Sequence, residues 1–200
     1  MRAFRQFLFP VTQTFAFTLV AVCPSIYSAP VATHFQRPLA SISRISNSVG
    51  AYDSGYCGNH LGQDLPQPAG TAVFAIADGD VKYSNNLKGL GHAVHVEHIL
   101  PDLTKVVSVY YHLKRLGSGG LALGSTVTRG QTIGYISDLA ADYGTGPHLH
   151  FGIRMGAYLT GTDSRTNKWY YPGYSSLFQS DGETRICSPS DAKHAQITSE

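Results

Sequence analysis

Charged residues are scarce in this sequence of 200 residues, since Asp, Glu, Lys and Arg together make up only 14%. So little charge argues against long solvated helices, and no stretch of the chain has a convincing helical period. Glycine is frequent, with 21 residues, and short apolar or alternating segments recur between glycine turns from residue 71 onward. The composition therefore favours a mostly β protein with many turns.

The sequence also lacks an excess of one charge over most of its length. The formal net charge is +2, but Arg2 and Arg5 lie in the first 28 residues, which contain no acid. The remainder has 13 basic and 13 acidic side chains and is neutral. No basic patch or RNA-binding motif follows, so we expect no nucleic-acid partner.

Long apolar runs are also scarce: a membrane-spanning helix needs about 20 predominantly apolar residues, so a permanent membrane anchor at residues 7–22 is the less favoured alternative. Residues 7–22 are largely apolar, but a proline and polar residues interrupt them within 10–14. A short basic start and the small residues that follow complete the pattern of a secretory signal peptide at residues 1–28. We expect an exported protein, periplasmic or secreted, without stable membrane insertion; lipid anchoring through Cys23 is the alternative.

Cysteine is rare, with three residues in the chain. If Cys23 leaves with the signal peptide, Cys57 and Cys187 remain, and an even number of cysteines in an exported protein favours a disulfide. Two free thiols are the alternative. So few cysteines also argue against a structural zinc site made of four cysteines or of mixed cysteines and histidines.

The pattern divides the mature chain into three parts. Residues 29–50 are rich in serine, proline and small polar residues, which predicts a linker. Residues 51–156 carry the strand pattern of a single domain. Beyond them the strand pattern weakens, and we interpret 157–200 as a C-terminal extension packed on the domain. We expect the protein to be a monomer.

The expected strands are short and lie between glycine turns. They cover residues 71–77, 81–83, 93–99, 105–113, 125–127, 131–136 and 148–151. The turn signal Asp78-Gly79-Asp80 predicts that 81–83 pairs back on 71–77. These features predict an all-β fold, an antiparallel β-sandwich or a partly open barrel, with few or no helices.

Alternation within two of these strands predicts which side chains share a face. In 105–113 it places Val107, Val109, Tyr111 and Leu113 on one face, with Ser108, Tyr110 and His112 on the other. In 93–99 it predicts a half-buried strand. His92, His95 and His98 are then split between faces, so we interpret them as surface or hydrogen-bonded interior histidines. His34 and His194 lie in poorly patterned ends and receive no role.

Two histidines in 148–151 alternate with apolar residues, as Gly146-Pro147-His148-Leu149-His150-Phe151 shows. A β-strand places His148 and His150 on the same face. A buried imidazole needs a partner for each ring nitrogen, so this face points either to solvent or to something that histidine binds.

A second candidate pair is His60 and Asp64. In a straight strand the two would lie about 13 Å apart, too far to share an ion easily. A bend at Gly62 would bring them together. With His150 they would offer two imidazoles and one carboxylate, a ligand set that suits Zn²⁺ and leaves a fourth position open.

Hydrolysis at such a metal also needs a proton acceptor and a donor to the oxyanion. No His-Glu-x-x-His helix supplies a glutamate for this purpose. His112 and His148 are the candidates, and the sequence leaves open which of them is the base.

Six motifs occur in order at ordinary spacing. They are His60-x-Gly-x-Asp64, Pro68-Ala69-Gly70-Thr71-Ala72-Val73, Asp78-Gly79-Asp80-Val81, Tyr111-His112-Leu113, Gly130-Gln131-Thr132-Ile133-Gly134 and the histidine strand already quoted. Over residues 57–155 the chain resembles the LytM/lysostaphin-type zinc peptidases of the M23 family. The resemblance implies the LytM-type fold and a zinc endopeptidase that cuts peptide cross-links between the stem peptides of bacterial peptidoglycan. It also implies one zinc ion on His60, Asp64 and His150, with His112 and His148 catalytic.

Two other functions are alternatives to a zinc endopeptidase. Degenerate LytM-type proteins act as non-catalytic regulators that activate another wall hydrolase, but they lose metal ligands, whereas here all five site residues are present. A histidine phosphocarrier would also be all-β with facing histidines, but an exported chain would be separated from its donor proteins. The cross-link that is cleaved stays open.

Overall fold

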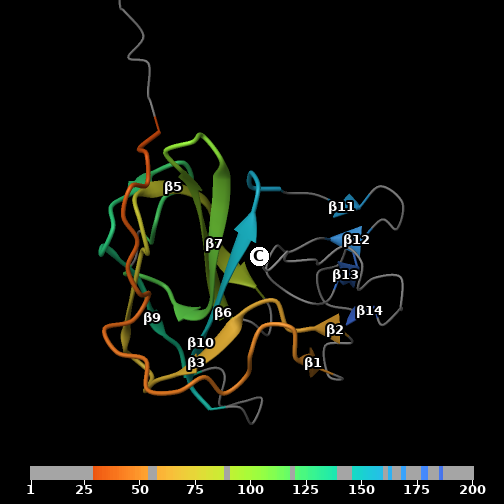
Figure 1. The fold of residues 1–200 in the computed structure, drawn as a ribbon. Helices are drawn as coiled ribbons and strands as arrows, with labels where there is room; N and C mark the ends of the chain where they lie inside the picture. Colours follow the sequence, from red (N-terminus) through yellow and green to blue (C-terminus); the bar gives the residue numbers. More distant parts are fainter. Residues whose placement is uncertain are drawn as a thin grey trace, which may run out of the picture.

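The computed structural model of the chain describes residues 29–53, 58–87, 91–117, 120–138 and 146–159, followed by four short strands further along. The expected signal peptide at 1–28, both Cys57 and Cys187, and most of 157–200 lie outside the described residues. Strands are the only regular elements in the described part (Figure 1). No helix there is long and apolar enough to cross a membrane.

One antiparallel sheet carries most of the fold. Its main path runs β3-β10-β7-β6-β5-β8, and β9 pairs with both β7 and β4. Its strands are β3 (Gln63–Pro66), β4 (Ala72–Phe74), β5 (Gly79–Leu87), β6 (Gly91–Ile99), β7 (Lys105–Lys114), β8 (Thr126–Val127), β9 (Thr132–Ile136) and β10 (His148–Met155). The predicted all-β antiparallel fold is confirmed, and the sheet is not closed into a barrel.

Two smaller antiparallel sheets complete the described strands. One pairs β1 (Tyr52–Asp53) with β2 (Gly58–Asn59). The other contains β11 (Thr162–Asp163), β12 (Lys168–Trp169), β13 (Leu177–Gln179) and β14 (Arg185–Ile186). In Figure 1 both lie on the same side of the large sheet.

The predicted pairing of 81–83 with 71–77 is wrong. β5 pairs with β6 and β8, whereas β4 pairs with β9. The backbone between β4 and β5 bonds elsewhere: the Ala75 N–H donates to the Gln131 carbonyl, and the Ile76 carbonyl accepts from the Gln36 N–H. The turn signal therefore joins two strands that pair with different partners and does not mark a hairpin.

Apolar side chains form two clusters, one on each face of the large sheet. The main core lies between the central strands and the β4–β9 pair, and its members include Val73, Val94, Val96, Tyr110, Leu113, Ile133, Ile136 and Leu149. A smaller cluster on the opposite face contains Ala93, Val107, Val109 and Tyr111. β6 is therefore buried on both faces, and the expectation of a half-buried strand is wrong.

A β-bulge in β7 breaks the alternation that the sequence predicts. His92 pairs with Leu113 and Val94 pairs with Tyr110, so Ala93 alone faces the two residues between them. The extra residue moves His112 onto the face of Tyr111 and turns Leu113 into the main core. The prediction that Tyr111 and Leu113 share a face is therefore wrong.

The segment expected as a linker at 29–50 contacts the sheet. Val31 forms a parallel bridge with Ile99, and Ala32 and Leu39 are buried in the main core. Further along, the Asp64 N–H donates to the Asn47 carbonyl at 2.9 Å. This segment therefore helps to fix the backbone position of Asp64.

His92, His95 and His98 all lie in β6, and all three side chains are buried. His98 donates from Nδ1 to the Asp78 carbonyl, and its Nε2 lies 2.7 Å from Ser108 Oγ. His92 contacts Ser84 and Asn86. These two match the interpretation as hydrogen-bonded interior histidines, whereas His95 has one unpartnered nitrogen among the described residues.

These buried histidines predict that the protein loses stability in mild acid. Burial lowers the pKa of His95 to about 3 and also lowers the pKa of His92 and His98. Below about pH 6.5 the unfolded chain therefore binds more protons than the folded one, and each such histidine costs up to about 1.4 kcal/mol per pH unit. We expect the urea midpoint of the metal-free protein to fall between pH 7 and pH 5, and less steeply in His95→Phe. An unchanged slope in that variant, measured beside the exposed His34→Gln as control, would contradict this.

Candidate metal centre

His60 and Asp64 come together because the chain bends between them. The bend lies at Gly62, immediately before β3, as the sequence predicts. His60 Nε2 lies 3.1 Å from Asp64 Oδ1, far closer than a straight strand would allow. A glycine is needed here for space, since a Cβ on residue 62 would lie 2.6 Å from His150 Nε2.

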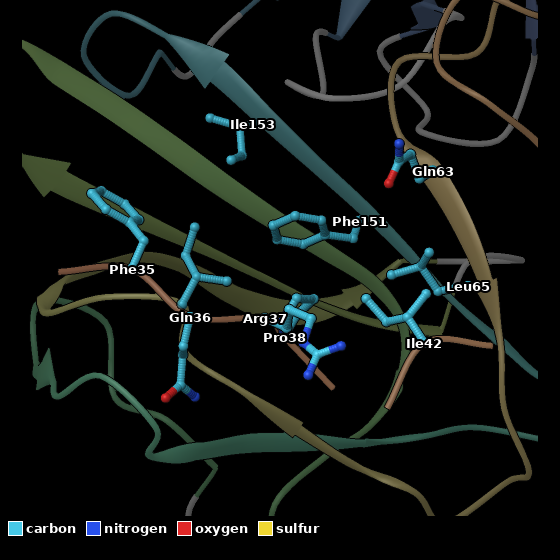
Figure 2. Close-up of a pocket in the computed structure, with 10 residues that line it drawn as sticks. Phe35, Gln36, Arg37, Pro38, Ile42, Gln63, Leu65, Phe151 and Ile153 are labelled. Carbon is cyan, nitrogen blue, oxygen red and sulfur yellow. The ribbon is translucent and has the colours of Figure 1, made fainter. Parts of the chain in front are cut away.

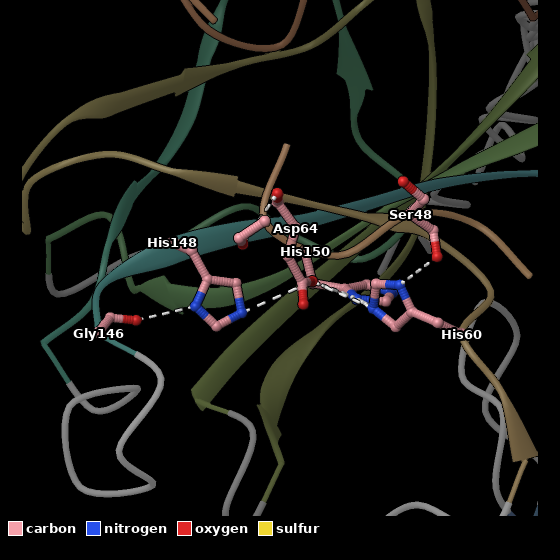
Figure 3. A network of polar contacts seen from close by, with 7 residues as sticks. Ser48, His60, Asp64, Gly146, His148 and His150 are labelled. Atoms are coloured by element: carbon pink, nitrogen blue, oxygen red, sulfur yellow. Dashed lines mark hydrogen bonds and ion pairs between the residues drawn. The ribbon is translucent and has the colours of Figure 1, made fainter. Parts of the chain in front are cut away.

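His150 reaches the same point from the neighbouring strand. β10 pairs with β3, and His150 lies directly opposite Asp64 in the register. Its Nδ1 lies 3.1 Å from Asp64 Oδ1 and 2.9 Å from His60 Nε2. Figure 3 shows the three side chains converging. The structure thus brings together all three residues that the sequence predicts as metal ligands.

Backbone carbonyls orient two of the imidazoles. The Nδ1–H of His60 donates to the Ser48 carbonyl at 3.2 Å, and that of His148 donates to the Gly146 carbonyl at 2.9 Å. In each neutral ring the proton then lies on Nδ1, and the Nε2 lone pair points into the site. Sequence reasoning missed both contacts, because a carbonyl partner leaves no signal in residue type.

The electrostatics of the site favour a charged carboxylate. Burial alone would raise the pKa of Asp64, but hydrogen bonds and charge from His150 and His60 outweigh it and hold this pKa well below its usual range. The carboxylate therefore keeps its negative charge at neutral pH. A negative oxygen facing two imidazole nitrogens is a set of donors that attracts a cation.

The spacing of the three donor atoms fits zinc. Tetrahedral Zn²⁺ with bonds of about 2.0–2.1 Å separates its ligand atoms by about 3.4 Å. The observed separations of 2.9–3.1 Å are a few tenths of an ångström shorter, so a small outward shift would admit the ion. Within the described residues, His60, Asp64 and His150 are the one group with geometry suited to a metal.

His112 and His148 lie beside these three residues. Their rings are 4.6 Å apart, and His148 Nε2 lies 3.6 Å from Asp64 Oδ1. His112 has a φ of 63°, a left-handed conformation that costs about 1–3 kcal/mol in most residues. The bulge in β7 holds this strained residue, and its carbonyl accepts the Ser137 N–H at 2.8 Å. The bulge therefore places the imidazole of His112 beside the candidate metal ligands.

An apolar pocket of about 470 Å³ lies on the other side of β3 and β10 (Figure 2). Leu65 and Phe151 line it, and these residues alternate with Asp64 and His150 along their strands. None of the candidate ligands borders this pocket. It is therefore separate from the opposite face of these strands, which carries Asp64 and His150 and which we call the metal face.

Part of the sequence is similar to known peptidases. The model of "Peptidase family M23" matches residues 58–163. DD-carboxypeptidase/endopeptidase Mpg of Neisseria meningitidis serogroup B is 34% identical over 96 residues, which are 48% of this chain and 20% of that protein. Peptidoglycan DD-endopeptidase ShyC of Vibrio cholerae serotype O1 is 36% identical over 92 residues, or 46% and 19% of the two proteins. The chain thus matches about a fifth of the length of these curated relatives.

A similar fold occurs among solved structures. The antimicrobial peptidase lysostaphin from Staphylococcus simulans aligns with a TM-score of 0.52 and 27% sequence identity. The alignment covers 64% of this chain and 50% of that chain.

Proposed function

The chain belongs to peptidase family M23, and on this premise we propose that it is a zinc-dependent endopeptidase that hydrolyses peptide cross-links of bacterial peptidoglycan. The observation that carries the proposal is the convergence of His60 Nε2, Asp64 Oδ1 and His150 Nδ1 within 3.1 Å of one another. The names of the relatives support the substrate class.

In this proposal His60, Asp64 and His150 hold one zinc ion. Zinc bound there supplies Lewis-acid chemistry, polarising a carbonyl and lowering the pKa of water towards about 7. We assign His148 as the group that accepts the proton of the attacking water. Its Nδ1–H donates to the Gly146 carbonyl, and its Nε2 faces the site. His112, whose ring lies 4.6 Å from that of His148, supports the negative charge that develops on the carbonyl oxygen.

Digestion of purified cell-wall sacculi tests this function. We expect the zinc-loaded protein to release muropeptides that lack the cross-link, as mass spectrometry would detect. Chelation should stop the release, and added Zn²⁺ should restore it. The masses of the products would identify the bond that is cleaved. If the zinc-loaded protein releases nothing but stimulates a second wall hydrolase, the regulatory function replaces this proposal.

Export is part of the same proposal. The basic and apolar pattern of residues 1–28 supports secretion to the periplasm or beyond. Cell fractionation with N-terminal sequencing of the mature protein would test it, and a cytoplasmic protein that retains Met1 would contradict it.

A further inference from the structure

A row of aromatic rings crosses the metal face of the large sheet, and the candidate ligand His150 lies near one end of it. The ring centroid of Tyr111 in β7 lies 5.5 Å from that of His150 in an edge-to-face arrangement. Tyr111 in turn lies 5.3 Å from His95 in β6. The ring of Tyr83 stacks on that of His95 with centroids 4.9 Å apart, and the ring centroid of Tyr158 lies 5.7 Å from that of His95. The rings therefore connect the metal site to the middle of the sheet.

A direct polar contact joins two members of the row. His95 Nε2 lies 2.9 Å from the hydroxyl oxygen of Tyr111, and both side chains have 0% exposed surface. The Tyr158 N–H donates to Glu97 Oε2 at 2.7 Å, and this bond holds Tyr158 beside His95. The contact between His95 and Tyr111 is thus enclosed on the metal face.

His95 lowers the stability of the folded protein at this position. Its Nδ1 has no hydrogen-bond partner among the described residues, and an unsatisfied buried polar atom costs about 1–3 kcal/mol. Burial keeps the ring neutral, since its pKa is lowered to about 3. An apolar side chain would fill the same space without this cost, but it would leave the Tyr111 hydroxyl without this partner. The polar contact that His95 makes in the described structure therefore serves Tyr111.

We propose that Tyr111, fixed by its contact with His95, is a positioning residue that holds the His150 imidazole in the orientation needed for metal binding. The His150 ring is confined by His60, whose centroid is 4.6 Å away, and by the backbone of Gly62. The ring of Tyr111 contacts the His150 ring as well. The contact with His95 fixes the hydroxyl end of Tyr111 and so limits tilting of its ring against His150. This inference rests on the proposed zinc site.

Zinc affinity measured with a competing chromophoric chelator tests the role of Tyr111. We expect Tyr111→Leu, which removes the ring, to weaken Zn²⁺ binding at least about tenfold, as loss of outer-shell partners of metal ligands typically does. Tyr111→Phe and His95→Phe each remove the polar contact between these two side chains and should weaken binding about fivefold. The double variant should be no weaker than either single variant, because both changes break the same contact.

Tyr110→Phe is the matched control. It makes the same chemical change one residue away, where the Tyr110 hydroxyl accepts the Ile76 N–H on the opposite face of the sheet. We expect it to lower thermal stability but to leave the zinc affinity and the Co²⁺ absorption spectrum unchanged, whereas Tyr111→Phe should alter both. Equal weakening of zinc binding in the two variants, or wild-type affinity in Tyr111→Leu, would overturn the role of Tyr111. Absence of zinc binding in the wild-type protein would instead overturn the proposed function.

Discussion

Replacement of His150 by alanine is expected to abolish peptidoglycan hydrolysis and to weaken zinc binding by about 100- to 1,000-fold. Structural zinc sites with four protein ligands contribute about 10–16 kcal/mol, so one ligand represents about 2.5–4 kcal/mol. The loss should be large because His150 contacts both other candidate ligands through the same Nδ1 atom. Metal content after dialysis and muropeptide release from sacculi are the two measurements.

His112→Ala is the matched variant for this prediction. It removes an imidazole from the same face, but His112 belongs to no group of candidate metal ligands in the described residues. We expect it to bind zinc like the wild type and to lose about 100- to 10,000-fold in turnover, the usual contribution of a positioned acid or base. Turnover retained in His150→Ala, or zinc lost equally in both variants, would refute the division of roles between these histidines.

The convergence of His60, Asp64 and His150 can be predicted from the sequence because the two parts of this candidate site follow local rules. The alternation around Leu149 places His148 and His150 on one face of a strand, whatever that strand pairs with. Similarly, Gly62 is the one residue between His60 and Asp64 that tolerates a close approach of the backbone. What local rules cannot supply is the register that sets His150 opposite Asp64.

The metal face of β7 shows where prediction from the sequence fails. A strict period of two places Tyr111 and His112 on opposite faces, yet a bulge brings both to the metal face. A bulge depends on how two strands align, so neither strand alone reveals it. The role inferred for His95 also leaves no signal in the sequence, because within the described residues the polar partner of its side chain is Tyr111, which lies 16 positions away in the next strand.

Gly62→Ala is expected to weaken zinc binding about 100-fold without removing any ligand. The new Cβ would lie 2.6 Å from His150 Nε2 and 2.7 Å from the Phe151 carbonyl oxygen, distances that real Cβ atoms essentially never show. The carbonyl belongs to β10 and has little freedom to move, so the imidazole must turn or β3 must separate from β10. Overpacking of this kind costs about 1–3 kcal/mol, and both responses spoil the alignment of His150 with Asp64.

Gly134→Ala separates this effect from general overpacking. A Cβ at residue 134 would lie 2.9 Å from Leu113 Cδ1, the end of a flexible side chain in the main core. We therefore expect Gly134→Ala to lower the urea midpoint but to keep the wild-type zinc affinity, whereas Gly62→Ala should lower both. If Gly62→Ala bound Zn²⁺ as tightly as the wild type, the close approach of the bend to His150 would have no part in shaping the metal site. A smaller loss in Gly62→Ala than in Tyr111→Leu would mean that the rings, more than the bend, hold the ligand in place.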